Sequence, residues 1–243
     1  MPIEAILIVT HNIEEAVLMC DRILIFGSHP GHVIGEIRVK LPQPRNRLDP
    51  TFRGLVDDIY ARMTARAAPQ PNRDGLFPGT GIAMVLPRVS SNEIAGLIET
   101  LAAEPYAGRA DLPPLADSLG LESDDFLPVA ETAQLLRLVE LEKGDIKLTQ
   151  TGKRFVAGEV DDRKRLIAQQ LATYVPLAAH IRRVLDERPN HRAPARRFRD
   201  ELEDFMAEDK AAETLRAIIS WARYAEYFAF DDEVDMFSLD NPV

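Results

Sequence analysis

Residues 6–16 place a histidine where an apolar run ends and a helical pattern begins. Residues 6–9 are all apolar and mostly β-branched, which is typical of a strand that is buried on both faces. Ile13, Ala16 and Val17 then recur at helical spacing. Ligands of open α/β sheets bind outside the carboxyl ends of the strands, so we expect His11 to face a ligand rather than the core.

The longer segment IVTHNIEEAVLMCDRILIF closely resembles the switch-histidine region of ATP-binding-cassette (ABC) ATPases, especially the branch that imports nitrate, sulfonate, taurine and bicarbonate. The resemblance continues through residues 29–33 and 41–45 and ends near residue 63. In that family the histidine of the VTH step contacts the γ-phosphate of ATP and helps to position the attacking water. His11 is the matching residue here, and the resemblance implies ATP and Mg²⁺ as cofactors of a completed ATPase.

The sequence contains no motif that would bind the rest of the nucleotide. Phosphoryl transfer needs a phosphate loop and a held Mg²⁺, yet no GxxxxGK[ST] pattern and no LSGGQ-like signature occur. Gly152-Lys153 is followed by Arg154 and has Lys147 in place of the first glycine, and the acidic residues 231–233 make a poor Walker B motif. We expect no nucleotide cofactor and no ATP hydrolysis in the isolated chain. His11 would be catalytic only where other segments complete the site, and otherwise a polar end-cap of the strand.

The composition divides the chain into three parts. We predict a C-terminal fragment of an ABC ATPase domain over residues 1–63, a linker rich in proline and glycine over 64–90, and an accessory domain over 91–243. The net charge is −10, and residues 1–90 carry ten of the basic and nine of the acidic residues, so the excess of acid lies after residue 90. No cysteine and histidine cluster suggests a metal site.

The first part predicts strand 5–10, helix 12–21, strands 23–27 and 33–39, and helix 50–66. These are too few strands for an independent α/β sheet. A strand that normally lies inside a parallel sheet would expose its edges, which invites pairing with another chain. We therefore expect a truncated gene product or a partner.

The second part predicts the order of a winged helix. A capping box at Ser90 and Glu93 opens a helix to about residue 103, a short helix ends at Gly120, and helix 124–138 precedes a hairpin of 138–141 with 146–148. Helix 207–227 and a final hairpin would make 165–240 a second, degenerate winged helix. The fold class is thus α+β and mostly α: a short α/β remnant of an ABC nucleotide-binding domain followed by a helical, winged-helix-like domain.

Three stretches of this part resemble the AAA-associated C-terminal domain that is appended to some nitrate/sulfonate-type ABC ATPases. They are residues 91–97, Leu148-Thr149 with Gly152, and residues 221–226. The resemblance implies a regulatory or interaction role and brings no catalytic residue. We expect the aromatic residues near Trp221 to form core rather than a ligand box.

Two other readings concern charge. A winged helix suggests a DNA-binding regulator, but helix 124–138 offers Asp124, Asp125 and Glu131 against Arg137 alone, so we expect no nucleic-acid partner. Arginines between residues 182 and 199 alternate with acidic residues, which indicates a paired and solvated surface rather than an anion site.

The whole sequence favours the C-terminal portion of the ATP-binding subunit of an ABC importer for nitrate/sulfonate-type anions. The expected partners are the membrane and ATP-binding subunits of the transporter, with a homo-oligomer as a further option. We expect a cytoplasmic protein that touches the inner membrane only through these subunits. The alternative is a stand-alone regulatory or dimerisation module without nucleotide binding. Neither the transported substrate, the regulatory ligand nor the oligomeric state is encoded in a visible motif.

Overall fold

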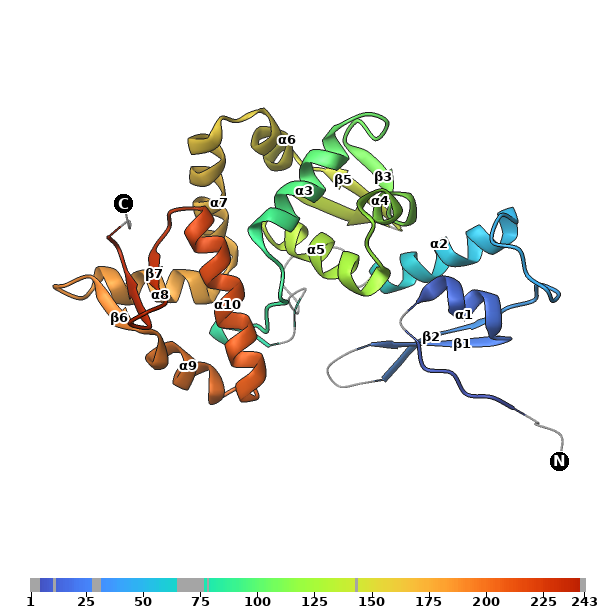
Figure 1. The fold of residues 1–243 in the computed structure, drawn as a ribbon, viewed down its shortest axis with the longest axis horizontal. Coiled ribbons are helices and arrows are strands. Elements are labelled where there is room, and N and C mark those ends of the chain that lie inside the picture. The colour runs from blue at the N-terminus through green and yellow to red at the C-terminus, as the bar shows by residue number, and fades with distance from the viewer. Residues whose placement is uncertain are drawn as a thin grey trace. The chain divides into compact units, whose positions relative to one another are not determined.

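The computed structural model describes residues 5–10, 12–27, 32–64, 77, 79–142 and 144–240. Over these residues the chain is mostly helical and carries three small sheets (Figure 1). It divides into two compact units. The first comprises residues 1–68, 110–127 and 141–146, and the second comprises residues 69–109, 128–140 and 147–243.

The first unit begins with a short helix and a two-stranded antiparallel sheet. Its elements are α1 (Ile13–Met19), β1 (Arg22–Gly27), β2 (His32–Arg38), α2 (Pro50–Thr64) and α4 (Leu112–Leu119). Helix α2 packs against α1, β1 and α4, because its apolar stripe buries Phe52, Val56 and Ile59. The elements predicted at 12–21, 23–27, 33–39 and 50–66 are therefore confirmed within a few residues.

The strand predicted at residues 5–10 does not form. These residues have no regular secondary structure, and β1 and β2 form a two-stranded sheet that does not include them. A strand requires a neighbouring backbone to pair its N–H and C=O groups. The described part of the chain supplies none for this segment, so its apolar pattern is not matched by a strand.

The second unit begins with η2 (Gly81–Ala83) and α3 (Ser91–Ala102), and the predicted capping box opens α3. The Glu93 N–H donates to Ser90 Oγ at 3.2 Å, and the Ser90 N–H donates to Glu93 Oε2 at 2.7 Å. These bonds satisfy two of the free donors at the helix start.

Helix α10 (Glu208–Tyr224) packs against several helices of this unit, including α3, α7 (Val160–Tyr174) and α8 (Pro176–Asp186). Trp221 is buried and donates its indole N–H to the Val89 carbonyl at 2.7 Å. This confirms that Trp221 belongs to the core, as predicted.

Two stretches of the chain share one order of elements. The first motif (residues 91–148) runs α3, β3 (Arg109–Asp111), α4, α5 (Ser123–Leu135), β4 (Val139–Glu142) and β5 (Asp145–Leu148), and α6 (Gln150–Ala157) follows. The second motif (residues 176–238) runs α8, β6 (Arg192–Pro194), α9 (Ala195–Glu203), α10, β7 (Ala229–Asp231) and β8 (Met236–Ser238). In each sheet the last strand lies between the other two, in the orders β3-β5-β4 and β6-β8-β7.

Two backbone hydrogen bonds recur at corresponding places in the motifs. One joins the end of the last strand to the residue before the first strand: Leu148 N–H to Gly108 O at 2.8 Å, and Leu239 N–H to His191 O at 3.2 Å. The other joins the start of the middle helix to the residue before the last strand: Leu112 N–H to Gly144 O and Ala195 N–H to Asp235 O, both at 2.9 Å. The motifs therefore share their backbone connections as well as their order.

The long helices α5 and α10 also end alike. Arg137 and Glu226 have left-handed backbones with φ of 57° and 50°. The residues that follow them donate to carbonyls five positions back, Leu138 to Ala133 at 2.9 Å and Tyr227 to Ala222 at 3.0 Å. This is the hydrogen-bond pattern of a Schellman helix end.

Candidate functional site

His11 lies outside the described residues, but the residues on both sides of it are described. Asn12 caps α1, because its Oδ1 accepts the Glu15 N–H at 3.0 Å. The Asn12 N–H donates to Thr10 Oγ1 at 3.1 Å, and Thr10 Oγ1 donates to Glu15 Oε2 at 3.2 Å. Asn12 Nδ2 also donates to Glu122 Oε2 at 3.1 Å. Side chains thus define the start of the helix that follows position 11.

Arg45 holds the other end of α1. Its Nη1 donates to the carbonyls of Val17 at 3.0 Å and Cys20 at 2.7 Å, and its Nε donates to the Leu41 carbonyl at 3.1 Å. Its Nη2 pairs with Asp21 Oδ1 at 2.9 Å, while the arginine side chain itself is only 1% exposed. A buried guanidinium here satisfies carbonyls that the helix end leaves free and matches the negative end of the helix dipole.

Sequence reasoning missed this role of Arg45. The available signal was a single arginine after two prolines in residues 41–45, within the stretch that carries the resemblance. Apart from the bond to the Leu41 carbonyl, its contacts join residues more than twenty positions apart, so local spacing alone does not reveal them.

The segment before His11 exposes its apolar side chains. Ile6, Leu7 and Val9 are 74%, 90% and 93% exposed. Phe26 on β1 and Val33 on β2 are exposed as well. We name residues 6–9 with Phe26 and Val33 the uncovered apolar face. A run of consecutive exposed apolar residues, such as residues 6–9, marks a surface that associates with something else.

The described residues of the first unit contain no cluster of metal-ligand side chains. Burial raises the pKa of Asp57, and the charge of Arg53 partly offsets this. No three histidine, cysteine or acidic residues in the described part of the chain are grouped to hold a metal ion.

The arginines between residues 182 and 199 form mainly surface ion pairs, as predicted. Five of them have carboxylate partners at 3.0–4.0 Å: Arg182 with Asp186, Arg192 with Asp240, Arg196 with Asp200, Arg197 with Glu201, and Arg199 with Asp235. Most of these side chains are well exposed, so each pair contributes little to stability.

Among the described residues, no helix has both the length and the apolar character needed to cross a membrane.

Comparison with known proteins adds two findings. Residues 113–231 match the family model of the C-terminal AAA-associated domain. Part of the chain is also similar to proteins that carry the name aliphatic sulfonates import ATP-binding protein.

SsuB 2 of Burkholderia cenocepacia is 39% identical over 70 residues, which are 28% of this chain and 26% of that protein. SsuB 2 of Pseudomonas syringae pv. tomato is 47% identical over 62 residues, 26% of this chain and 23% of that protein. The chain thus spans about a quarter of the length of these relatives. No solved structure matches it.

Proposed function

We propose that this chain is a component of the ATP-binding subunit of an ABC importer. It carries a C-terminal AAA-associated domain and is in part similar to the ATP-binding proteins of such importers. In this proposal residues 1–63 contribute the switch-histidine region of the nucleotide-binding domain. Residues 64–90 are a linker, and residues 91–243 are an accessory domain. The cargo class is an organic or inorganic anion of the sulfonate and nitrate type.

The observation that carries this proposal is the uncovered apolar face. Leu7 and Val9 are 90% and 93% exposed in a segment whose pattern is that of a buried strand. Burying a side chain of this kind is worth about 1.5–3 kcal/mol. Pairing residues 5–10 with strands of a larger parallel sheet would bury these side chains and satisfy the backbone together.

His11 then follows the carboxyl end of a strand inside that sheet, where ligands of such sheets bind. We propose that it contacts the γ-phosphate of ATP once other segments supply the phosphate loop and the Mg²⁺ ligands. The sequence given carries no phosphate-loop pattern, so no step of hydrolysis is assigned to this chain by itself.

The accessory domain is proposed to be winged-helix-like, with a second copy of the same arrangement in the second motif. Its shared strand orders support this proposal. We assign it a regulatory or interaction role, in the cytoplasm, with membrane contact only through transporter subunits and without a nucleic-acid partner.

The test uses the purified chain and a second polypeptide that holds the phosphate loop, signature and Walker B segments of the Burkholderia relative. Association is measured by analytical ultracentrifugation, and ATP hydrolysis is measured on the mixture. We expect association and ATP hydrolysis with the native chain, association without hydrolysis for His11→Ala, and no association for Leu7→Asp/Val9→Asp.

A matched control changes two exposed residues away from the uncovered apolar face, Val160→Asp and Val234→Asp. These changes should leave association intact. Association that persists in the Leu7→Asp/Val9→Asp variant, or full hydrolysis by His11→Ala, would contradict the proposal.

The second candidate function is a stand-alone regulatory module that binds no nucleotide. It is favoured by the second unit, which has a closed core of its own around Trp221, Phe198 and Phe237. Failure of the mixture to associate, together with an accessory domain that retains its fold and self-associates, would favour this candidate.

A further inference from the structure

A groove of ≈ 930 Å³ runs along α10 in the second unit. Glu208 at the start of α10 and Arg223 near its end both line it, so it follows about 22 Å of helix at 1.5 Å per residue. Ser91 of α3 and residues of α9, β7 and the turn after β7 form the remaining walls. The groove is of the size that small-molecule sites have.

In the first motif the corresponding positions of α5 are buried. Counted back from the left-handed residues that end the two helices, three residues of α10 in the groove match three residues of α5: Arg216 matches Leu127, Ile219 matches Ala130, and Arg223 matches Gln134. The three residues of α5 are buried, whereas Arg216 and Arg223 are exposed. The shared order of elements therefore does not require an open face on α10.

Three arginines reach the groove, and two of them have carboxylate partners. Arg223 pairs with Asp232 and donates to the Phe230 carbonyl at 2.6 Å, and Arg199 lies 3.5 Å from Asp235. Arg216 differs, because its Nε donates only to the Ala212 carbonyl of its own helix at 3.2 Å. Within the described part of the chain Arg216 makes no ion pair, so its guanidinium can receive an anion.

The surface beside Arg216 is apolar. Leu215 and Ile219 line the groove from α10, and Phe230 lines it from β7. Glu208, Asp232 and Asp235 also line it, and they disfavour a ligand with several negative charges. A single charge with an apolar portion fits both features.

We propose that this groove binds a small organic monoanion with an apolar tail, an alkyl carboxylate or an alkanesulfonate. The head group accepts hydrogen bonds from the Arg216 guanidinium, which presents donors in a planar fork suited to such oxygens. The tail lies on Leu215, Ile219 and Phe230. The site belongs wholly to the second unit and binds its ligand whether or not the first unit joins an ATPase.

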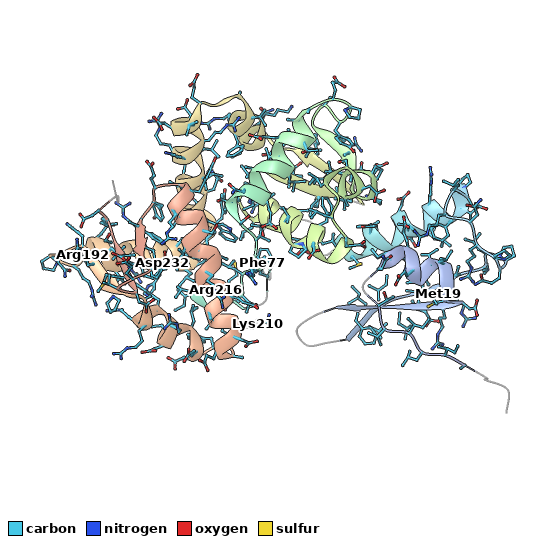
Figure 2. All side chains as sticks on the ribbon, in the orientation of Figure 1. Met19, Phe77, Arg192, Lys210, Arg216 and Asp232 are labelled. Carbon is cyan, nitrogen blue, oxygen red and sulfur yellow. The ribbon has the colours of Figure 1, made fainter. Side chains whose placement is uncertain are left out.

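Isothermal titration calorimetry of the full chain with sodium 1-hexanesulfonate tests the head-group contact. Arg216→Gln removes the free cation and should weaken binding at least about tenfold, since one charge-assisted hydrogen bond is worth that much. Lys210→Gln is the matched control. Lys210 lies on the same helix, pairs with Glu213 at 2.7 Å and does not line the groove (Figure 2). It should change the affinity less than about twofold, as expected for an exposed pair.

Further titrations test the tail and the head separately. Methanesulfonate should bind at least about tenfold more weakly than hexanesulfonate, because it has no tail to bury. Ile219→Ser should weaken hexanesulfonate and leave methanesulfonate unchanged. Titration with hexanoate in place of hexanesulfonate compares the two head groups. The anion that binds more tightly identifies the head-group class of the ligand.

Three results would overturn the assignment. They are equal affinity of hexanesulfonate for the Arg216→Gln variant and the native chain, equal losses in Arg216→Gln and Lys210→Gln, and tighter binding of inorganic phosphate than of either organic anion. The assignment is also wrong if calorimetry detects no binding of any organic anion at a concentration of about 10 mM. A site with a charged head contact and a buried tail should have a Kd below about 10 mM.

Discussion

The two motifs share backbone hydrogen bonds but fill their interiors differently. At matched positions the first motif buries the aliphatic residues Leu115, Val139 and Ile146, and the second buries Phe198, Phe228 and Phe237. The ring centroids of Phe198 and Phe228 each lie 5.4 Å from that of Phe237, and the ring planes are nearly perpendicular. The arrangement is therefore specified by backbone connections and by which positions are apolar, while the choice of side chain is free within that pattern.

The turns show the same contrast. Gly108 and Gly144 take left-handed backbones in the first motif, whereas His191 and Asp235 do so in the second, with φ of 49° and 51°. A residue with a Cβ is strained there by roughly 1 kcal/mol. The second motif tolerates this strain because the same two backbone hydrogen bonds hold both residues in place.

The largest expected effect comes from Gly152→Ala in α6, the helix that follows the first motif. A Cβ on Gly152 would collide with the Leu138 carbonyl oxygen and lie 3.0 Å from Leu148 Cδ2. Because the carbonyl belongs to the backbone, relief requires α6 to move away. We expect a loss of about 3 kcal/mol in the free energy of unfolding, measured by urea denaturation.

Gly96→Ala is the matched control in α3, where an added Cβ meets no heavy atom within 4 Å. It should raise the free energy of unfolding by about 0.5–1 kcal/mol through helix propensity. Similar effects of the two substitutions would show that α6 is not seated against Leu138.

The next effect concerns Glu131 of α5, whose counterpart on α10 is Ser220. Burial raises the pKa of Glu131 to about 7 from an ordinary value of 4.5. The folded chain thus binds this proton more tightly than the unfolded chain. The protonated carboxyl therefore makes its full contribution to the free energy of unfolding below about pH 4.5, and this contribution is lost as the pH rises to about 7.

Glu131→Gln removes this ionisation and should stabilise the chain by about 3 kcal/mol at pH 8 and by about 0 at pH 4. Denaturant midpoints at the two pH values provide the measurement. The exposed Glu140→Gln serves as the control and should show no difference between them. A pH-independent effect of Glu131→Gln would mean that the carboxyl group is not buried.

The smallest effect compares the ends of α4 and α9. Gly120 ends α4 with φ 65° and ψ 29°, whereas Asp204 ends α9 with φ −64°. Gly120→Ala should lower the free energy of unfolding by about 1 kcal/mol, because only the glycine is left-handed. Asp204→Ala should change it by less than about 0.5 kcal/mol in the same denaturation assay. Equal losses would show that the two helix ends are not distinguished by handedness.

Elements with strong local patterns were predictable from the sequence. The capping box at Ser90, the left-handed end at Gly120 and the hairpin of β4 with β5 rest on residues near one another in the chain. The short strands β3 and β6 were missed, because three residues carry too little alternation to indicate a strand. Residues 5–10 were predicted as a strand on local pattern alone, although a strand depends on a partner.

The candidate site was predictable only in part. The sequence places His11 at the end of an apolar run, and its role stays a prediction. The groove on α10 was not foreseen, since it joins Arg199, Arg216 and Asp232 from separate elements. The sequence instead indicated the ion pairs of the neighbouring arginines, because their acidic partners mostly lie four residues away.

Arg45 links the end of α1 to the loop of residues 41–45. The helix is a rod of seven residues, about 10 Å long, and the guanidinium ties its last carbonyls to residue 41. The same guanidinium also bonds the Val17 carbonyl near the end of α1, so one side chain fixes where the proline-containing loop lies against that end of the helix.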